Sequence, residues 1–290
     1  MSLQDYLPFS GNDQPSALTG SDVQHLDLGF ANAYTIGRPG GPWVLVDTGT
    51  PGSASTIRRA AEQRFGSGAR PEAIILTHGH GDHSGSARDL AEAWDVPIYA
   101  HEAEMPFLTG RSEYPPADPT IGGPLSLMAR FEGSEAIDLG DRLETLPADG
   151  EVPHAMADWQ WIHTPGHTPG HVALYRETDG TLIAGDAVVT ADQESWSSLL
   201  TSQPGAYRPP AVFTPNWTAA RASVERLAEL EPNILATGHG PPIQGSEVAR
   251  QLQYLARHFV PPERGRYVEQ PAVQQERRAE RDPVVLANTP

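Results

Sequence analysis

The sequence contains no cysteine, and all 20 of its basic residues are arginine, so it contains no lysine either. The absence of cysteine excludes disulfide bonds, iron–sulfur clusters, cysteine zinc sites and a cysteine nucleophile. The absence of lysine excludes a Schiff-base lysine and the lysine of a phosphate-binding loop. Chemistry that depends on a thiol or an amine side chain is thereby ruled out.

Long hydrophobic runs and an excess of positive charge are missing too. The longest apolar runs, such as WVLV and AIIL, are far shorter than the roughly 18 residues that a membrane helix needs. With 37 acidic residues against 20 basic ones, the net charge of −17 argues against a nucleic-acid groove. The N-terminal sequence MSLQDYLPFSGNDQP lacks the basic and apolar regions of a signal peptide. We therefore expect a cytoplasmic protein with a small-molecule substrate and no nucleic-acid or membrane partner. A homodimer is compatible with these features.

Glycine and proline, with 28 residues each, divide the sequence into many short elements. The spacing of apolar residues predicts helices over 54–65, 86–94, 219–230 and 246–259. Ser246 is expected to cap the last of these helices. Short apolar strands lie between the helices, and this alternation in both halves of the chain predicts an α/β fold built in layers.

We expect a single domain at 21–260, between an N-terminal arm at 1–20 and a C-terminal tail at 261–290. Two segments, 103–135 and 190–215, lack a clear period and are interpreted as lid-like insertions. Their apolar and aromatic residues either cover a cleft or pack the insertions down, and they are Met105, Phe107, Leu125, Met128, Phe131, Trp196, Tyr207 and Phe213.

The densest chemical signal is the string THGHGDHSG at 77–85, which follows the apolar run AIIL directly. It places four side chains that can bind a metal within six residues: His78, His80, Asp82 and His83. Imidazole and carboxylate ligands suit zinc, iron or manganese. A polar surface turn with chance histidines is the alternative, and the density of the string disfavours it.

Three further candidates stand in similar settings, each just past an apolar run and beside glycine. They are His167 in TPGHTPGH, Asp186 at the end of LIAGD, and His239 in LATGHG. Each alone fits an ordinary turn residue. Together with the first string they make five histidines and two aspartates, which is enough for two metal ions.

These four motifs, in this order, resemble the metallo-β-lactamase superfamily over about residues 22–245. The resemblance implies a four-layer αββα sandwich with metals in a cleft at one edge of two sheets. By motif position it implies that one metal is held by His78, His80 and His167. It implies Asp82, His83 and His239 as the ligands of the other metal, with Asp186 bridging both.

The resemblance also implies roles for neighbouring residues. Asp47 in VDTG would orient the ligand loop through hydrogen bonds, although a plain turn aspartate fits nearly as well. Asn32 is expected to be structural. His171 is expected to be a buried, hydrogen-bonded core histidine, and the same interpretation applies to His101, His154 and His163.

The implied activity is metal-assisted hydrolysis by a hydroxide that bridges two zinc ions, with iron or manganese as the other metals considered. Asp82 or Asp186 would take the proton and pass it to the leaving group. The glyoxalase II and lactonase-like branch fits best, so we expect cleavage of a carboxylic ester-type bond in a lactone, ester or thioester. A mononuclear iron enzyme of the persulfide dioxygenase type and a phosphodiesterase of the same fold are the alternatives.

Two departures from these branches leave the substrate open. Glyoxalase II enzymes hold glutathione with basic residues that include lysine, and here Arg250 and Arg257 are the obvious substitutes. Lactonases of the family place a tyrosine three residues after the bridging aspartate, where this sequence has Val189. Tyr207 and Tyr34 are the candidates to replace that tyrosine. β-Lactamase activity is disfavoured, because those enzymes depart at the position of Asp186.

Overall fold

The structure is a computed structural model of the 290-residue chain. It describes residues 16–18, 22–123, 126, 138–147, 156–192, 204–268 and 270–272. All seven predicted metal ligands lie inside these ranges. Five residues discussed above lie outside them: Leu125, Met128, Phe131, His154 and Trp196.

The first sheet contains seven strands that lie side by side in chain order. They are β1 (Ser16–Ala17), β2 (Val23–Asp27), β3 (Asn32–Gly37), β4 (Trp43–Val46), β5 (Ile74–Ile75), β6 (Ile98–Ala100) and β7 (Leu143–Thr145). Strands β1 to β4 pair antiparallel, and β4 to β7 pair parallel. Because β4 and β5 run the same way, the residues that follow them, Asp47 and the loop at 77–85, meet at one edge of the sheet. Two residues of the expected N-terminal arm thus form an edge strand.

The second sheet contains five strands in the order β12-β11-β10-β9-β8. Their bounds are β8 (Gln160–His163), β9 (Val172–Arg176), β10 (Thr181–Ile183), β11 (Ile234–Ala236) and β12 (Ile243–Gln244). Strand β10 is parallel to β11 and antiparallel to β9, which is in turn antiparallel to β8. Strands β8, β10 and β11 therefore share a direction, and His167, Asp186 and His239 all follow their carboxyl ends.

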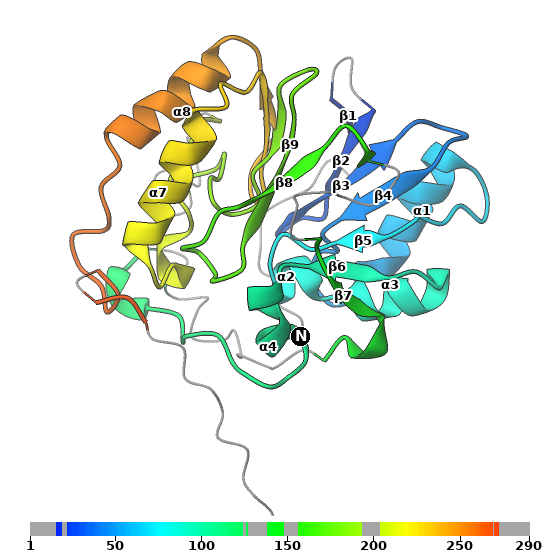
Figure 1. Cartoon of the computed structure of the whole chain (residues 1–290), viewed down its shortest axis with the longest axis horizontal. Coiled ribbons are helices and arrows are strands. Elements are labelled where there is room, and N and C mark those ends of the chain that lie inside the picture. The colour runs from blue at the N-terminus through cyan, green and yellow to red at the C-terminus, as the bar shows by residue number, and fades with distance from the viewer. Residues whose placement is uncertain are drawn as a thin grey trace, which may run out of the picture.

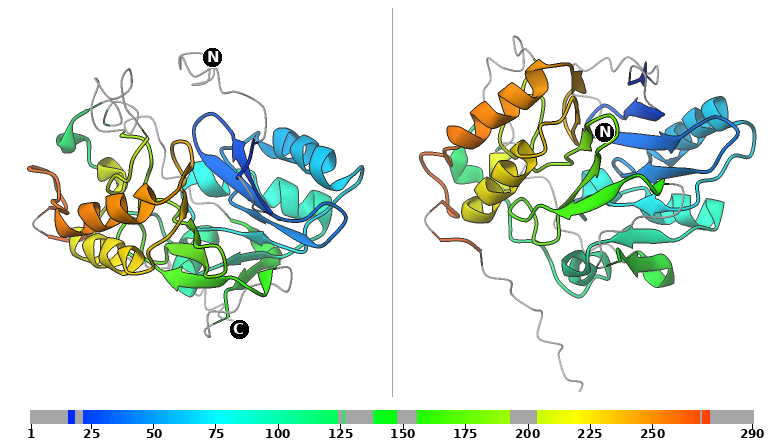
Figure 2. Two further views of the ribbon diagram at one scale, coloured as in Figure 1. Left: turned by 90° about the horizontal axis from the view of Figure 1, so that it is seen from above. Right: turned by 45° about the horizontal axis from the view of Figure 1, so that its top comes forward.

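Helices cover the outer face of each sheet. The α-helices are α1 (Ala54–Phe65), α2 (Gly81–Ser84), α3 (Ala87–Trp94), α4 (Met105–Leu108), α7 (Trp217–Ala228) and α8 (Glu247–Arg257). The 3-10 helices are η2 (Glu102–Glu104), η3 (Pro119–Ile121), η4 (Gly140–Arg142) and η6 (Ala211–Phe213). Helices α1 and α3 lie against the first sheet, and α7 and α8 lie against the second, with the two sheets between them (Figure 1 and Figure 2).

The core explains why these layers form. In β4, Leu45 packs with α1 and α3, whereas Val44 and Val46 pack in the cluster between the sheets. In β10, Leu182 packs with α7 and α8, whereas Ile183 faces the first sheet. Side chains alternate between the two faces of a strand, so apolar residues at consecutive positions pack into the cores on both sides of the sheet. Three apolar clusters therefore separate four layers, and the predicted αββα sandwich is confirmed.

The predicted helices are confirmed with small shifts at their ends. Helix α1 has the predicted bounds, with Ile57 and Ala61 fully buried. Helix α7 begins two residues earlier than predicted, because the side chain of Asn216 accepts a hydrogen bond from the amide of Ala219 at 3.0 Å. Ser246 stands at the N-cap of α8, but its side chain makes no capping hydrogen bond, so that part of the prediction is wrong.

The described part of the first insertion is anchored from two sides. The amide of Asp118 donates to the carbonyl of Val212 at 2.8 Å, next to η6. On the other side, the carboxylate of Asp118 accepts from the amide of Arg266, and the hydroxyl of Tyr267 donates to the carbonyl of Pro116 at 2.8 Å. Residues near 266 in the predicted tail thus pack against the insertion. In the described ranges, no helix is long and apolar enough to cross a membrane.

Candidate metal centre

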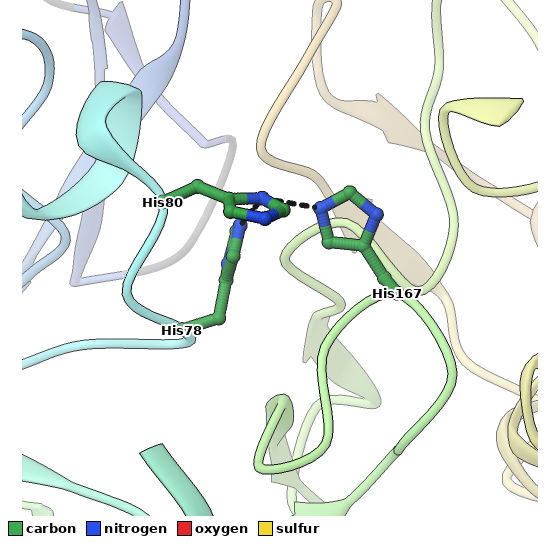
Figure 3. Close-up of side chains that lie close together, drawn as sticks. All are labelled: His78, His80 and His167. Carbon is green, nitrogen blue, oxygen red and sulfur yellow. Dashed lines mark hydrogen bonds between the residues drawn. The ribbon is translucent and has the colours of Figure 1, made fainter. Parts of the chain in front are cut away.

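Three histidines from both sheets converge at the edge where their strands end. Nε2 of His78 lies 3.1 Å from Nδ1 of His80, which in turn lies 3.0 Å from Nε2 of His167 (Figure 3). Zinc–nitrogen bonds of about 2.0–2.1 Å at a tetrahedral angle would separate two nitrogens by about 3.3 Å. The three ring nitrogens therefore have nearly the spacing of a single metal's ligands.

The remaining four side chains gather beside this group. Nε2 of His239 lies 3.3 Å from Oδ2 of Asp82 and 3.1 Å from Oδ2 of Asp186. Nε2 of His83 lies 3.6 Å from a carboxylate oxygen of each aspartate. Asp186 also reaches the first group, because its Oδ2 lies 3.4 Å from Nε2 of His167. The structure thus brings together all seven side chains that the sequence singled out, with Asp186 between the two groups.

Hydrogen bonds behind the rings fix which nitrogen faces inward. The hydroxyl of Thr77 donates its proton to Asp47 at 2.8 Å, so its oxygen accepts from Nδ1–H of His78 at 3.1 Å. The same logic applies to Thr214, which donates to the carbonyl of Pro210 and accepts from Nδ1 of His167 at 3.3 Å. Both histidines therefore turn an unprotonated Nε2 toward the cluster.

The other group of ligands is oriented in the same way. Nδ1–H of His83 donates to Oδ2 of Asp47 at 2.9 Å, and Nδ1–H of His239 donates to the carbonyl of Phe30 at 2.9 Å. Asp47 also accepts from the amide of Thr77 at 2.8 Å, so it orients the ligand loop as the resemblance implied. Four of the five histidines thus have an outer partner at Nδ1, which leaves Nε2 facing inward as the nitrogen that can bind a metal.

The electrostatics differ between the two groups. Burial lowers the pKa of His78 and of His167 well below the usual histidine value, and it lowers that of His80 to about 4. Burial also lowers the pKa of His83, but the carboxylates of Asp82 and Asp186 outweigh it and raise that pKa to about 9. The three histidines of the first group are therefore uncharged at neutral pH. The second group contains the carboxylates of Asp82 and Asp186, which require a positive charge close by.

Burial raises the pKa values of Asp82 and Asp186, but the charges of His83 and His239 outweigh it, and both values fall below the usual range. Both carboxylates are thus ionised. Oδ1 of Asp186 and Nε2 of His83 are buried without a hydrogen-bond partner among the described residues. Unpartnered buried polar atoms are costly, and inward-facing lone pairs repel one another. The donor set therefore fits transition-metal ions, which would satisfy these atoms.

Several neighbouring residues lie where the sequence analysis expected them. His171 is fully buried, and its Nε2 accepts from the amide of Asp186 at 2.9 Å, so it holds the backbone of that residue. Asn32 is structural, since its side-chain amide donates to the carbonyls of Thr237 and Gly240 on either side of His239. For His101 and His163 the predicted burial is wrong, because both are only half-buried and stack on each other at 4.1 Å. The predicted hydrogen bonds are confirmed, since Nδ1 of His101 accepts from the amide of Ala103 and Nε2 of His163 lies 2.8 Å from the carbonyl of Pro169.

The two tyrosine candidates have different outcomes. Tyr34 is buried, and its hydroxyl donates to the carbonyl of Thr237 at 2.8 Å, so its role is structural. Tyr207 pairs with Val189 through two backbone hydrogen bonds of 3.1 and 2.8 Å. The chain therefore places a tyrosine beside the position where lactonases carry one, and Tyr207 remains the candidate.

Besides Thr77 and Thr214, the sequence did not reveal several other residues around the ligands. The ring of Tyr114 lies 4.7 Å from that of His80, and the ring of Phe30 lies 5.8 Å from that of His239. Glu104, which is fully buried, accepts a hydrogen bond from the amide of Gly79 between two of the ligands. The motif HEAE around Glu104 looks like an ordinary acidic surface turn, so composition alone gave no signal.

Comparison with known proteins agrees with this geometry. The sequence model of the metallo-beta-lactamase superfamily matches residues 26–239, so the chain belongs to this superfamily. The probable metallo-hydrolase YflN of Bacillus subtilis is 44% identical over 258 residues, which cover 88% of this chain and 97% of the relative. The probable metallo-hydrolase YybB of the same organism is 29% identical, over 70% of this chain and 78% of the relative.

Solved structures show the same fold. TTHA1623 in a di-iron-bound form is 30% identical with a TM-score of 0.51, over 76% of this chain and 93% of that chain. The B3 metallo-beta-lactamase BLEG-1 is 25% identical with a TM-score of 0.56, over 78% of this chain and 95% of that chain. The chain is therefore a metal-dependent hydrolase of the metallo-beta-lactamase superfamily, with a cluster of histidines and aspartates suited to metal.

Proposed function

We propose that the protein is a dinuclear zinc hydrolase that cleaves a carboxylic ester-type bond in a small molecule. The observation that carries this proposal is the convergence of five histidines and two aspartates in two adjoining groups. The inward lone pairs and the two ionised carboxylates support two ions rather than one. A single iron held by His78, His80 and His167 would not use Asp82, His83 and His239 as ligands.

In this proposal one ion is held by His78, His80 and His167, and the other by Asp82, His83 and His239, with Asp186 shared. When bound, such ions supply Lewis acidity and lower the pKa of a coordinated water. Nitrogen and carboxylate ligands suit zinc, and they also suit iron, which TTHA1623 contains in its di-iron-bound form. Metal analysis decides between these ions.

The two carboxylates differ in exposure, and this suggests different tasks. The side chain of Asp82 is 17% exposed, whereas that of Asp186 is 2% exposed and lies between both groups. We assign to Asp82 the proton that the attacking water loses and its delivery to the leaving oxygen. Asp186 holds the two groups at a fixed spacing. Asp82 can exchange protons with solvent between turnovers.

The substrate class follows from the side chains around His80. Phe213 is partly exposed and its ring lies 5.9 Å from that of His80, on the opposite insertion from Tyr114. An apolar or acyl portion of a substrate would contact these rings. Arg250, one candidate for holding glutathione, instead pairs with Glu247 on the exposed side of α8. We therefore favour an uncharged lactone or ester over a glutathione thioester.

Metal analysis followed by a hydrolysis panel tests the proposal. The panel contains lactones of two chain lengths, lactoylglutathione, aryl esters, a phosphodiester and a chromogenic β-lactam. We expect about two transition-metal ions per chain and turnover of the lactones or aryl esters. Turnover of the phosphodiester alone would favour the phosphodiesterase alternative. One iron per chain with oxygen consumption on a persulfide would overturn the proposal. A cytoplasmic location and a homodimer remain predictions.

A further inference from the structure

A buried carboxylate outside the seven ligands links the two loops that carry the three-histidine group. Glu104 ends η2, just after β6, and its side chain is fully buried. Its Oε2 accepts from the amide of Gly79 at 2.9 Å, and its Oε1 accepts from the amide of Gly170 at 2.7 Å. Each carboxylate oxygen of Glu104 is thus bound to a different loop.

The two loops belong to different sheets. Gly79 lies between His78 and His80 in the loop after β5, and Gly170 lies three residues after His167 in the loop after β8. Within the first loop, the ring nitrogens of the ligands are 3.1 Å apart, and the distance across to the second loop is 3.0 Å. Glu104 therefore spans the same gap that a metal bound by the three histidines would span.

Glycine is required at both contact points. A Cβ atom at Gly170 would lie 2.8 Å from the backbone nitrogen and Cγ of Glu104, which is closer than real Cβ contacts. A Cβ atom at Gly79 would overlap the hydroxyl of Tyr114, which also donates a hydrogen bond to Oε2 of Glu104. The amides can approach the carboxylate only because neither residue has a side chain.

We propose that Glu104 is a positioning residue that sets the spacing of the three-histidine metal group by holding both ligand loops through their backbone amides. It touches neither substrate nor metal. A carboxylate has acceptors for both amides, whereas an amide side chain offers one acceptor and turns a donor toward the other N–H group. Glu104→Gln therefore keeps the size of the side chain while it breaks one of the two ties.

This inference rests on the proposed metal centre, so its test measures metal binding directly. The full chain is loaded with cobalt, and the affinity of each site is measured by competition with a chelator. Paramagnetically shifted imidazole N–H signals report which histidines are bound. Outer partners of metal ligands typically alter affinity 10- to 100-fold, so we expect about that loss at the three-histidine group in Glu104→Gln. The group of Asp82, His83 and His239 should keep its affinity.

Glu102→Gln is the matched control, because it removes the same charge from the same short helix at an exposed position. It should bind both ions as the unaltered chain does. Glu104→Gln with normal affinity at both sites would overturn the inference, even if the metal-free protein melts at a lower temperature. If the unaltered chain binds no metal, the proposed function fails instead.

A second variant decides the question if Glu104→Gln does not fold. Tyr114→Phe removes the hydroxyl that donates to Oε2 and that also accepts from the amide of Gly79 at 3.1 Å, so it loosens the tie to the first loop and leaves the tie to Gly170 in place. We expect a loss of a few-fold in cobalt affinity at the three-histidine group, with unchanged shifts for His83 and His239. Unchanged affinity at the three-histidine group in this variant would overturn the inference.

Discussion

Nδ1 of His83 donates to Oδ2 of Asp47 at 2.9 Å, and this contact determines which nitrogen of His83 faces Asp82 and Asp186. The backbone of Asp47 has a φ of 58°, in the left-handed region. Aspartate and asparagine tolerate this conformation better than most residues. The position can therefore be changed to asparagine with little strain, which makes the contact testable.

Asp47→Asn should weaken metal binding without unfolding the protein. The remaining side-chain oxygen can accept from the amide of Thr77, and the new NH₂ group then faces Nδ1 of His83 as a donor. His83 loses its acceptor at Nδ1 and with it the preference for Nε2 as the nitrogen that binds the metal. Competition with a chelator should show about a 10- to 100-fold loss of affinity. Asp89→Asn, at an exposed position of α3, is the control and should bind normally.

Asp186→Ala should lower metal occupancy in both groups and abolish turnover. Oδ2 of Asp186 lies 3.1 Å from Nε2 of His239 and 3.4 Å from Nε2 of His167, so its loss removes a neighbour from each group. The fold should survive, because His171 holds the backbone amide of residue 186 rather than its side chain. Metal analysis and circular dichroism measure these outcomes. A variant that retains most of its activity would reduce Asp186 to a strand-end turn residue.

Metal affinity should rise with pH. The pKa of His83 in the metal-free protein is about 9, so near neutral pH this histidine carries a proton that a metal ion must displace. For each displaced proton, the apparent affinity should rise about tenfold per pH unit and level off above about pH 9. Calorimetry in buffers of different ionisation enthalpy counts the released protons. An affinity that stays constant between about pH 6 and 9 would contradict the assignment.

Turnover should fall as the solution is acidified below neutral pH, where protons compete with metal at His83, and should be lost near pH 4, where His80 is protonated too because burial lowers its pKa to about 4. Protonated imidazole does not bind metal, so the ligands are lost as they titrate. A pH profile measured together with metal content distinguishes this from denaturation. Undiminished activity at about pH 4 would be incompatible with a histidine-rich centre.

Phe213→Ala should change substrate binding but not metal content. Its ring lies 5.9 Å from that of His80, yet it is not one of the seven ligands. Loss of apolar contact should cost about 1–3 kcal/mol, which corresponds to a rise in KM of roughly 5- to 150-fold for substrates with an acyl chain. Tyr254→Ala, at a side chain 66% exposed on α8, is the control. If Phe213→Ala loses metal and activity together, the ring only supports the ligands.

The ligands could be predicted from the sequence because each of them follows a strand end beside glycine. Parallel strands deliver such residues to one sheet edge, so His78 and Asp47 had to be neighbours once β4 and β5 were identified. The short apolar runs could not reveal that both sheets meet at the same edge. That relation comes from the resemblance to the superfamily and is confirmed by the packing of Val46, Ile75 and Ile183 between the sheets.

The supporting residues could not be predicted, because their roles depend on contacts distant in sequence. The hydroxyl of Thr214 is hydrogen-bonded to His167, which lies 47 positions away in the sequence. The carboxylate of Glu104 accepts from the amide of Gly170, which lies 66 positions away. Neither stands in a motif with fixed spacing. Tyr114 lies in a segment without helical or strand periodicity, so its position beside His80 follows only from how the insertion folds back.

The division of the ligands between the two sheets has a consequence for biosynthesis. The ribosome makes His78, His80, Asp82 and His83 early, but the three-histidine group is incomplete until His167 is made. The second group waits for His239, more than 150 residues after the first ligand by the numbering of the chain. Neither group of ligands is therefore complete in the N-terminal half of the chain: the first needs His167, and the second needs His239.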